Sequence, residues 1–209
     1  LTNLHLSQRG SFGDIAASSF RGMVYYTSPD RSELLEQLQN KSIKEICDSD
    51  WKDLTIERLP VIPDFTLLVG WTGQVAITDS LIQATEKKRK VATDSEFYKE
   101  FLKKSHAIVQ GLQIAWNKQD IPDLQEGIRA NRALLNEFAK VMQLEIETPA
   151  LQALCDLAEQ VGACAKTSGA GGGDCGICFT QNEQQRQQIE TQWAKAQIQV
   201  LPLTIAEAW

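Results

Sequence analysis

The stretch AKTSGAGGGDCGICF, residues 165–179, places four glycines within five positions between two apolar segments. A flexible linker has polar flanks, whereas ACAKT before the glycines and CGICFT after them predict short strands. A wide hairpin turn with positive φ angles is the simpler interpretation. The run has more glycines than a hairpin needs, and Lys166, Ser168 and Asp174 flank it. We therefore favour a backbone surface whose amides can approach a phosphate.

Two common phosphate-binding patterns do not fit this stretch. A Walker loop ends in Gly-Lys-Ser/Thr, which is absent here, and the dinucleotide fingerprint G-x-G-x-x-G needs a glycine where Asp174 stands.

Outside the glycine stretch, strands and helices mix without the regular alternation of a parallel sheet. This mixture favours an α+β fold. The rigid segment PVIP, 60–63, predicts a boundary between one domain at 1–60 and a second at 61–209. Strands are expected at 1–8, 23–27, 53–59, 64–71, 163–167, 175–180 and 198–203, and helices at 13–20, after Asp30, at 76–90, after a Thr93–Glu96 capping box, near Pro122, after Thr148 and at 182–196.

Composition excludes several classes of protein. With 209 residues, 43% of them hydrophobic and 23% charged, the chain can form a sizeable core. A net charge of −6 gives no electrostatic footprint for nucleic acid. No apolar run approaches the roughly 20 residues of a membrane helix, and the first residues lack a signal-peptide pattern. We expect a cytoplasmic protein with no membrane or nucleic-acid partner.

The five cysteines are an odd number and are scattered, which predicts free thiols in a reducing compartment. The pair Cys175 and Cys178 is at most half of a zinc site, because the remaining cysteines and the two histidines supply no second ligand pair at usable spacing. On a strand, residues three apart point to opposite faces. We expect no metal site formed by this pair.

Two further stretches could carry chemistry. In SFGDIAAS, 11–18, Asp14 either caps a helix of small residues or is an aspartate presented at a helix start beside a cleft. In VGWTGQVAITDS, 69–80, a strand-to-helix turn can bind an anion through free amides, although an ordinary turn explains it equally well.

Taken together, and in this order, the stretches 11–18, 69–80 and 166–177 resemble the bacterial phosphomevalonate kinases of the GHMP small-molecule kinase superfamily. The resemblance covers most of the chain. It implies the end of an S5-like N-terminal domain followed by a ferredoxin-like α/β sandwich. The superfamily loop P-x-x-x-G-L-x-S-S-A, which wraps the nucleotide phosphates, and the lysine-bearing N-terminal strand do not occur in this sequence. We therefore expect a C-terminal fragment that is inactive by itself.

The resemblance also implies an activity, transfer of the γ-phosphoryl group of ATP, with Mg²⁺, to the phosphate of 5-phosphomevalonate in the mevalonate route to isoprenoids. Asp14 matches the catalytic aspartate. Ser168, Gly169 and Ala170 match positions beside the substrate, and Gly171 and Gly172 follow them in the same loop. Lys166 and Ser28 are further substrate-binding candidates. No residue of this chain is assigned to the nucleotide or the metal.

A phosphate acceptor lowers the demand for a general base. A phosphate monoester has a second pKa of about 6, so it is already mostly ionised at neutral pH. We therefore expect Asp14 to organise the site, including a lysine outside this sequence, rather than to remove a proton.

Two alternatives remain. One is another GHMP kinase whose acceptor is a hydroxyl, of the mevalonate or homoserine type. The other is a non-catalytic fragment that binds a phosphorylated metabolite. Removal of part of a domain would expose apolar surface near 1–60, which predicts self-association of the isolated chain.

Overall fold

The computed structural model describes residues 10–73, 95–169 and 171–206. It contains two compact units, Leu1–Val61 with Ile205–Trp209, and Ile62–Thr204. The predicted strand at 1–8, the predicted helix at 76–90 and Thr93 lie outside the described residues. The interpretation of 1–60 and 61–209 as parts of two kinase domains stays a prediction.

The first unit contains a two-stranded antiparallel sheet in which Val24 pairs with Arg58. Its core is Leu34 and Ile46, with Phe12 and Trp51 packed against them. The helix that begins at Ile43 was not predicted. Its signal was present in the sequence, since Ser42 and Glu45 form a capping box. The elements are α2 (Gly13–Phe20), β1 (Val24–Thr27), α3 (Arg31–Asn40), α4 (Ile43–Cys47) and β2 (Thr55–Arg58).

The second unit has a four-stranded sheet of order β4-β5-β3-β6, in which all neighbours are antiparallel. This is the strand order of a β-α-β-β-α-β ferredoxin-like fold. The predicted α+β class is confirmed. The elements are β3 (Thr66–Trp71), α6 (Glu96–Lys118), α7 (Ile121–Met142), α8 (Pro149–Glu159), β4 (Cys164–Thr167), β5 (Cys175–Thr180), α9 (Glu183–Lys195) and β6 (Gln199–Leu201).

Short polar side chains start the helices of this unit. Thr148 caps α8, as its position before Pro149 predicts. Helix α6 differs from the prediction, because Ser95 rather than Thr93 caps it, and its hydroxyl accepts a hydrogen bond from the Tyr98 amide. A cap must stand directly before the first helical residue, and only Ser95 does.

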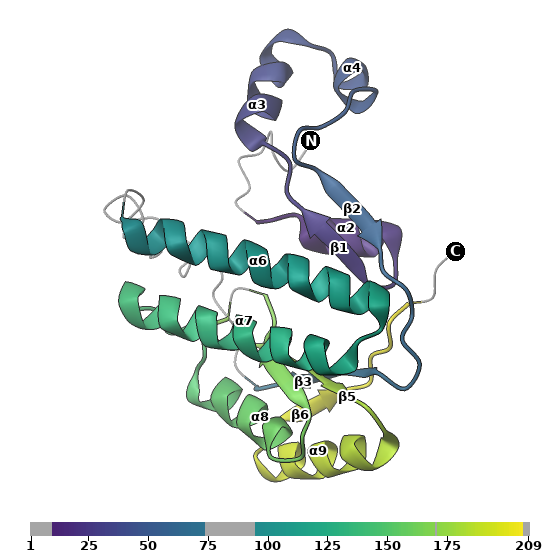
Figure 1. Cartoon of the computed structure of the whole chain (residues 1–209), viewed down its shortest axis with the longest axis vertical. Helices are drawn as coiled ribbons and strands as arrows, with labels where there is room; N and C mark the ends of the chain where they lie inside the picture. Colours follow the sequence, from purple (N-terminus) through teal and green to yellow (C-terminus); the bar gives the residue numbers. More distant parts are fainter. Residues whose placement is uncertain (1–9, 74–94, 170, 207–209) are drawn as a thin grey trace. The chain divides into compact units, whose positions relative to one another are not determined.

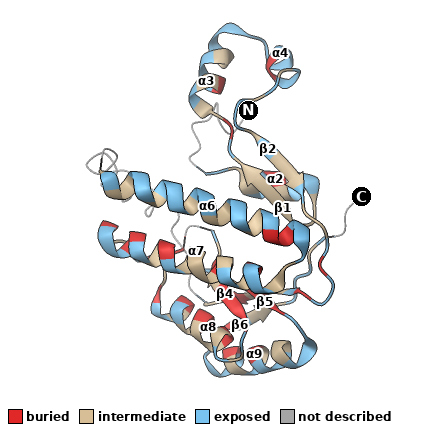
Figure 2. Cartoon of the chain, in the orientation of Figure 1, coloured by how far each residue is buried: buried red, intermediate tan, exposed pale blue. Residues whose placement is uncertain are grey.

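Helices cover both faces of the sheet (Figure 1). Neighbouring residues of β5 point to opposite faces. Cys178 packs with Leu154 of α8 and Trp193 of α9, whereas the Phe179 ring meets Trp116 of α6, with centroids 5.7 Å apart. Figure 2 shows buried residues concentrated on the strands and on the helix faces turned toward them.

A pair of glycines lets α8 approach the sheet closely. Gly70 of β3 pairs with Gly176 of β5. A Cβ atom at Gly176 would lie 2.6 Å from the Leu154 side chain, and one at Gly70 would lie 2.8 Å from both Leu154 and Trp193. The Trp193 indole also donates a hydrogen bond of 3.0 Å to the Leu154 carbonyl. Glycine is therefore required at both positions for packing.

We predict that Gly176→Ala lowers the free energy of unfolding by about 1–3 kcal/mol, because overpacking forces the Leu154 side chain to move. The matched control is Gly111→Ala in α6, where an added Cβ would meet nothing within 4 Å. Alanine at that exposed helical position should stabilise by up to about 1 kcal/mol. Urea unfolding measures both changes, and equal midpoints for the two variants would contradict the packing argument.

Candidate phosphate-binding site

The loop between β4 and β5 has a backbone that glycine favours. The φ angles of its described residues are 62° at Gly169, 77° at Gly171, 81° at Gly172, 128° at Gly173 and 63° at Asp174. Successive backbone N–H groups in a turn conformation can form a concave surface that binds an anion. The glycine run is therefore a shaped turn rather than a linker.

Hydrogen bonds fix this loop at three places. The Ser168 amide donates to the Cys175 carbonyl at 3.0 Å, which continues the β4–β5 pairing. The amide and the hydroxyl of Thr72 both donate to the Asp174 carbonyl at 2.9 Å. The Gly172 amide donates to the Ile146 carbonyl at 2.7 Å. The structure thus brings the GWTG turn and the glycine loop together.

Close packing explains one glycine of the loop. A Cβ atom at Gly171 would lie 2.3 Å from the Ile146 carbonyl oxygen. At Gly169 the space around such an atom is open. Within the described part of the chain, the amides of Gly169, Gly171 and Gly173 have no hydrogen-bond partner. Such amides can donate to phosphate oxygens.

The candidate substrate residues of this loop differ in exposure. Gly169 is exposed, Ser168 and Gly172 are half-buried and Gly171 is buried. Ala170 lies outside the described residues. Sequence reasoning missed Thr72 and Ile146 as anchors of the loop. The GWTG turn was a signal for Thr72, but Ile146 holds the loop through its backbone carbonyl, which leaves no mark on the sequence.

Lys166 lies on β4, two residues before Ser168. Its ammonium donates a hydrogen bond of 2.7 Å to the Thr167 carbonyl. Burial lowers the pKa of Lys166 below the ordinary lysine value. A partly desolvated ammonium at the entry of the loop would gain from a bound anion.

Asp14 lies in the first turn of α2, in the other unit. The N-cap is Phe12, with a φ angle of 65°, and its side chain makes no capping bond. Asp14 is therefore not the N-cap, although its charge lies in the first turn, where it favours the helix N-terminus. Its carboxylate is exposed and has no hydrogen-bond partner among the described residues, so it is available to a ligand.

Neighbouring side chains hold the segment that leads to Asp14. The Tyr26 hydroxyl donates to the Ser11 carbonyl at 2.8 Å. The Arg31 guanidinium donates to the Gly10 carbonyl and lies 4.5 Å from the centroid of the Phe12 ring. These contacts fix the start of α2. Ser28, the other candidate in this unit, is exposed directly after β1.

The remaining chemistry of the described residues is limited. No group of three metal-ligating side chains occurs among them, and the five cysteines are free thiols. Cys175 and Cys178 lie on β5, and burial raises the pKa of Cys178 above the ordinary thiol value.

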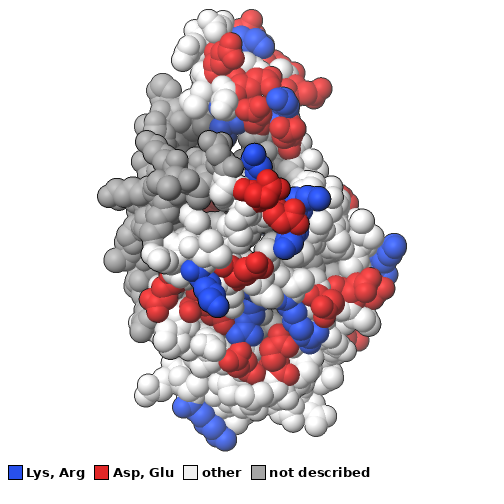
Figure 3. Space-filling model, turned by 60° about the vertical axis from the view of Figure 1, so that its left-hand side comes forward, with Lys and Arg blue, Asp and Glu red and all other residues white. Residues whose placement is uncertain are grey.

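On the face drawn in Figure 3, acidic and basic side chains are interspersed rather than gathered by sign. None of the described helices is long and apolar enough to cross a membrane.

Comparison with known proteins identifies the region that contains the loop. Residues 109–199 match the family described as GHMP kinases C terminal. This region of the chain is therefore similar to the C-terminal domains of that family. The chain is also 36% identical, over 208 residues, to a curated phosphomevalonate kinase from Streptomyces sp. (strain CL190).

Solved structures also match the chain. A protein from Listeria innocua has 32% identity and a TM-score of 0.93, and its match covers 99% of this chain and 57% of that one. Streptococcus pneumoniae phosphomevalonate kinase, in complex with phosphomevalonate and AMPPNP, has 27% identity and a TM-score of 0.82, with 95% and 56% covered. The curated Streptomyces relative is covered at 55% of its length, with 99% of this chain aligned. The chain therefore spans just over half the length of these relatives.

We predict that Gly171→Ala disrupts the loop more than Gly169→Ala does. Both place alanine at a positive φ, which costs about 1 kcal/mol, but only Gly171 also faces the Ile146 carbonyl at close distance. Urea unfolding with a probe of the loop, such as the glycine amide resonances, measures the difference. Equal destabilisation would show that the Ile146 contact does not restrict the loop.

We predict that Lys166→Met is more stable than the wild type at neutral pH. Because its pKa is lowered in the folded state, Lys166 opposes folding where it is protonated, and this penalty disappears as the pH rises through the lowered pKa to the ordinary lysine value of about 10.5. The advantage of the variant should therefore shrink between pH 7 and pH 10.5. Urea unfolding of both proteins across this range tests it, and a constant difference would contradict the assignment.

Proposed function

We propose that this chain is part of a kinase that transfers a phosphoryl group from ATP to 5-phosphomevalonate, giving the 5-diphosphate. The observation that carries this proposal is the 36% identity to a curated phosphomevalonate kinase across 99% of the chain. The Streptococcus pneumoniae relative was solved with phosphomevalonate and AMPPNP, which supports the same acceptor and a nucleotide donor.

The glycine loop supports a phosphorylated ligand. The amides of Gly169, Gly171 and Gly173 have no partner among the described residues. They can donate to phosphate oxygens without reorganisation, because the neighbouring bonds of Ser168 and Gly172 already fix the backbone. We assign Ser168, Gly169, Ala170, Gly171 and Gly172 to substrate binding, with Lys166 adding positive charge at the loop entry and Ser28 a hydroxyl contact.

Asp14 is the proposed catalytic residue. Since the attacking phosphate oxygen is mostly ionised at neutral pH, Asp14 would not need to remove a proton. Its carboxylate would instead orient the reacting groups through its charge. ATP supplies the phosphoryl group. Mg²⁺ belongs to the proposed reaction, but the described residues do not form a metal site by themselves, and no step is assigned to it here. We also propose a cytoplasmic location and self-association through exposed apolar residues of the first unit, among them Ile15, Phe20 and Ile43.

The native protein that carries this chain is the material for the test. It is incubated with ATP and, in parallel, with 5-phosphomevalonate, mevalonate or homoserine, and ADP release and product mass are measured. ADP release with 5-phosphomevalonate alone supports the proposal. Turnover of mevalonate or homoserine instead would favour a hydroxyl-accepting kinase. Binding of 5-phosphomevalonate without turnover would favour a non-catalytic binding protein.

We predict that Asp14→Asn in the native protein lowers kcat by about tenfold or more, because a charge that organises the reacting groups is lost. The dependence of kcat on pH between 6.5 and 8.5 should keep the shape found for the wild type. A rate that newly rises by one logarithmic unit for each pH unit would instead show that Asp14 removes a proton. Glu36→Gln, at an exposed position of α3, is the control and should leave kcat unchanged.

A further inference from the structure

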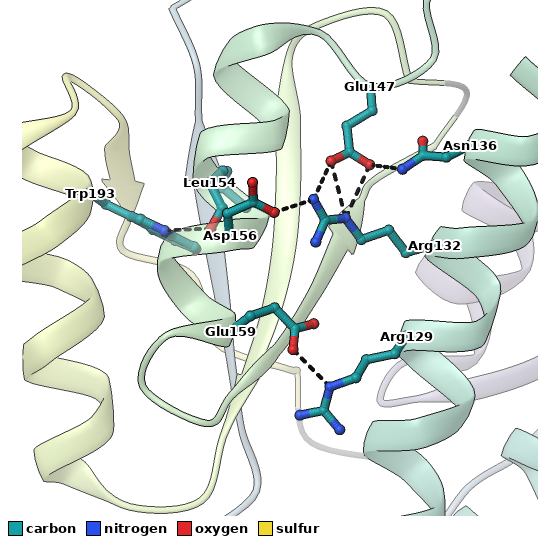
Figure 4. Close-up of polar contacts among 8 residues, drawn as sticks. All are labelled: Arg129, Arg132, Asn136, Glu147, Leu154, Asp156, Glu159 and Trp193. Atoms are coloured by element: carbon teal, nitrogen blue, oxygen red, sulfur yellow. Dashed lines mark hydrogen bonds and ion pairs between the residues drawn. The ribbon is translucent and has the colours of Figure 1, made fainter. Parts of the chain in front are cut away.

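The segment between α7 and α8 holds a carboxylate that is almost completely buried. The side chain of Glu147 is only 6% exposed. Both of its oxygens accept hydrogen bonds of 3.1 Å from Nε of Arg132, and one also accepts from Nη2. Asn136 donates to the second oxygen at 2.6 Å. Figure 4 shows Arg132 and Asn136 reaching this carboxylate from α7.

A third partner extends the cluster to α8. Nη2 of Arg132 also donates to Asp156 at 2.6 Å. Arg132 of α7 therefore contacts both α8 and the segment between α7 and α8. Its side chain is 16% exposed. A planar guanidinium bonded on two sides leaves little freedom to the groups that it holds.

Glu147 is adjacent to the residue that anchors the glycine loop. The carbonyl of Ile146, which accepts from the Gly172 amide at 2.7 Å, lies in the same planar peptide unit as the nitrogen and Cα of Glu147. On its other side, Glu147 is followed by Thr148, the N-cap of α8. Fixing the Glu147 side chain therefore limits rotation of the Ile146 carbonyl.

We propose that Glu147, held by Arg132 and Asn136, is a positioning residue that sets the glycine loop through the Ile146 carbonyl. The proposal rests on the proposed function for its kinetic consequence, since the loop is taken to bind the phosphate of the acceptor. If Ile146 turns, the bond to Gly172 weakens and the close contact with Gly171 changes. The loop amides of Gly169, Gly171 and Gly173 then no longer match the phosphate.

The same helices provide a matched control. Arg129 of α7 pairs with Glu159 of α8 at 2.8 Å, and Figure 4 shows this pair apart from the Glu147 cluster. Like the Glu147 cluster it joins α7 to α8, but Glu159 lies at the end of α8 remote in sequence from Ile146. If the ion pairs between α7 and α8 only stabilised the packing of the two helices, loss of either pair would have a similar effect on the glycine loop.

The test compares Glu147→Gln with Glu159→Gln in the native protein. Hydrogen exchange of the Gly172 amide, followed by NMR, should be faster by on the order of tenfold in Glu147→Gln and unchanged in Glu159→Gln, because only the first variant loosens the Ile146 carbonyl. The KM for 5-phosphomevalonate should rise by on the order of tenfold in Glu147→Gln, with the KM for ATP unchanged.

A second variant guards against a failure of Glu147→Gln to fold. Asn136→Ala leaves the Arg132–Glu147 pair in place and should shift the same two readouts by a smaller factor. Gly172 exchange in Glu147→Gln and Asn136→Ala that equals the exchange in Glu159→Gln would overturn the proposal. If the wild type does not phosphorylate 5-phosphomevalonate, the proposed function fails, whereas the exchange comparison still decides the positioning role.

Discussion

The packing of Leu154 on two paired glycines is the constraint on which the second unit depends. Gly70 and Gly176 stand opposite each other in β3 and β5, and the Leu154 side chain occupies the space that a Cβ atom at either position would need. A shift of one residue in this register would place side chains against α8 and turn the buried face of β5 toward the opposite helices. The contact therefore sets both the helix distance and the strand register.

The candidate site follows from that register. With Trp71 opposite Cys175, the next residue along each strand brings Thr72 to the Asp174 carbonyl. This bond closes one end of the glycine loop, and the Ile146 carbonyl holds its middle. The loop thus has two anchors from distant parts of the chain, while several of its amides have no partner within the part of the chain that the structure describes. A surface of this kind suits an anion because its donors are oriented before the ligand arrives.

Local chemistry made much of the secondary structure predictable. Thr148 before Pro149 marks the start of α8, and the small residues after Gly13 form α2 over the predicted range. The glycine stretch between two apolar segments indicated strand, turn and strand, as the structure has it. The alternative in which Asp14 caps the helix did not foresee Phe12 as the N-cap, because the left-handed backbone of Phe12 is not an outcome that residue type indicates.

The sequence by itself determined the α+β class, most helix starts and the resemblance that singled out Asp14 and the glycine loop. Only the tertiary structure decided which groups hold that loop. The Ile146 carbonyl is a backbone group that any residue would carry, and Arg132 and Glu147 are separated by 15 positions with no periodic signal linking them. Such contacts depend on how α7, α8 and the sheet pack together, and packing between elements distant in sequence has no local pattern from which it could be predicted.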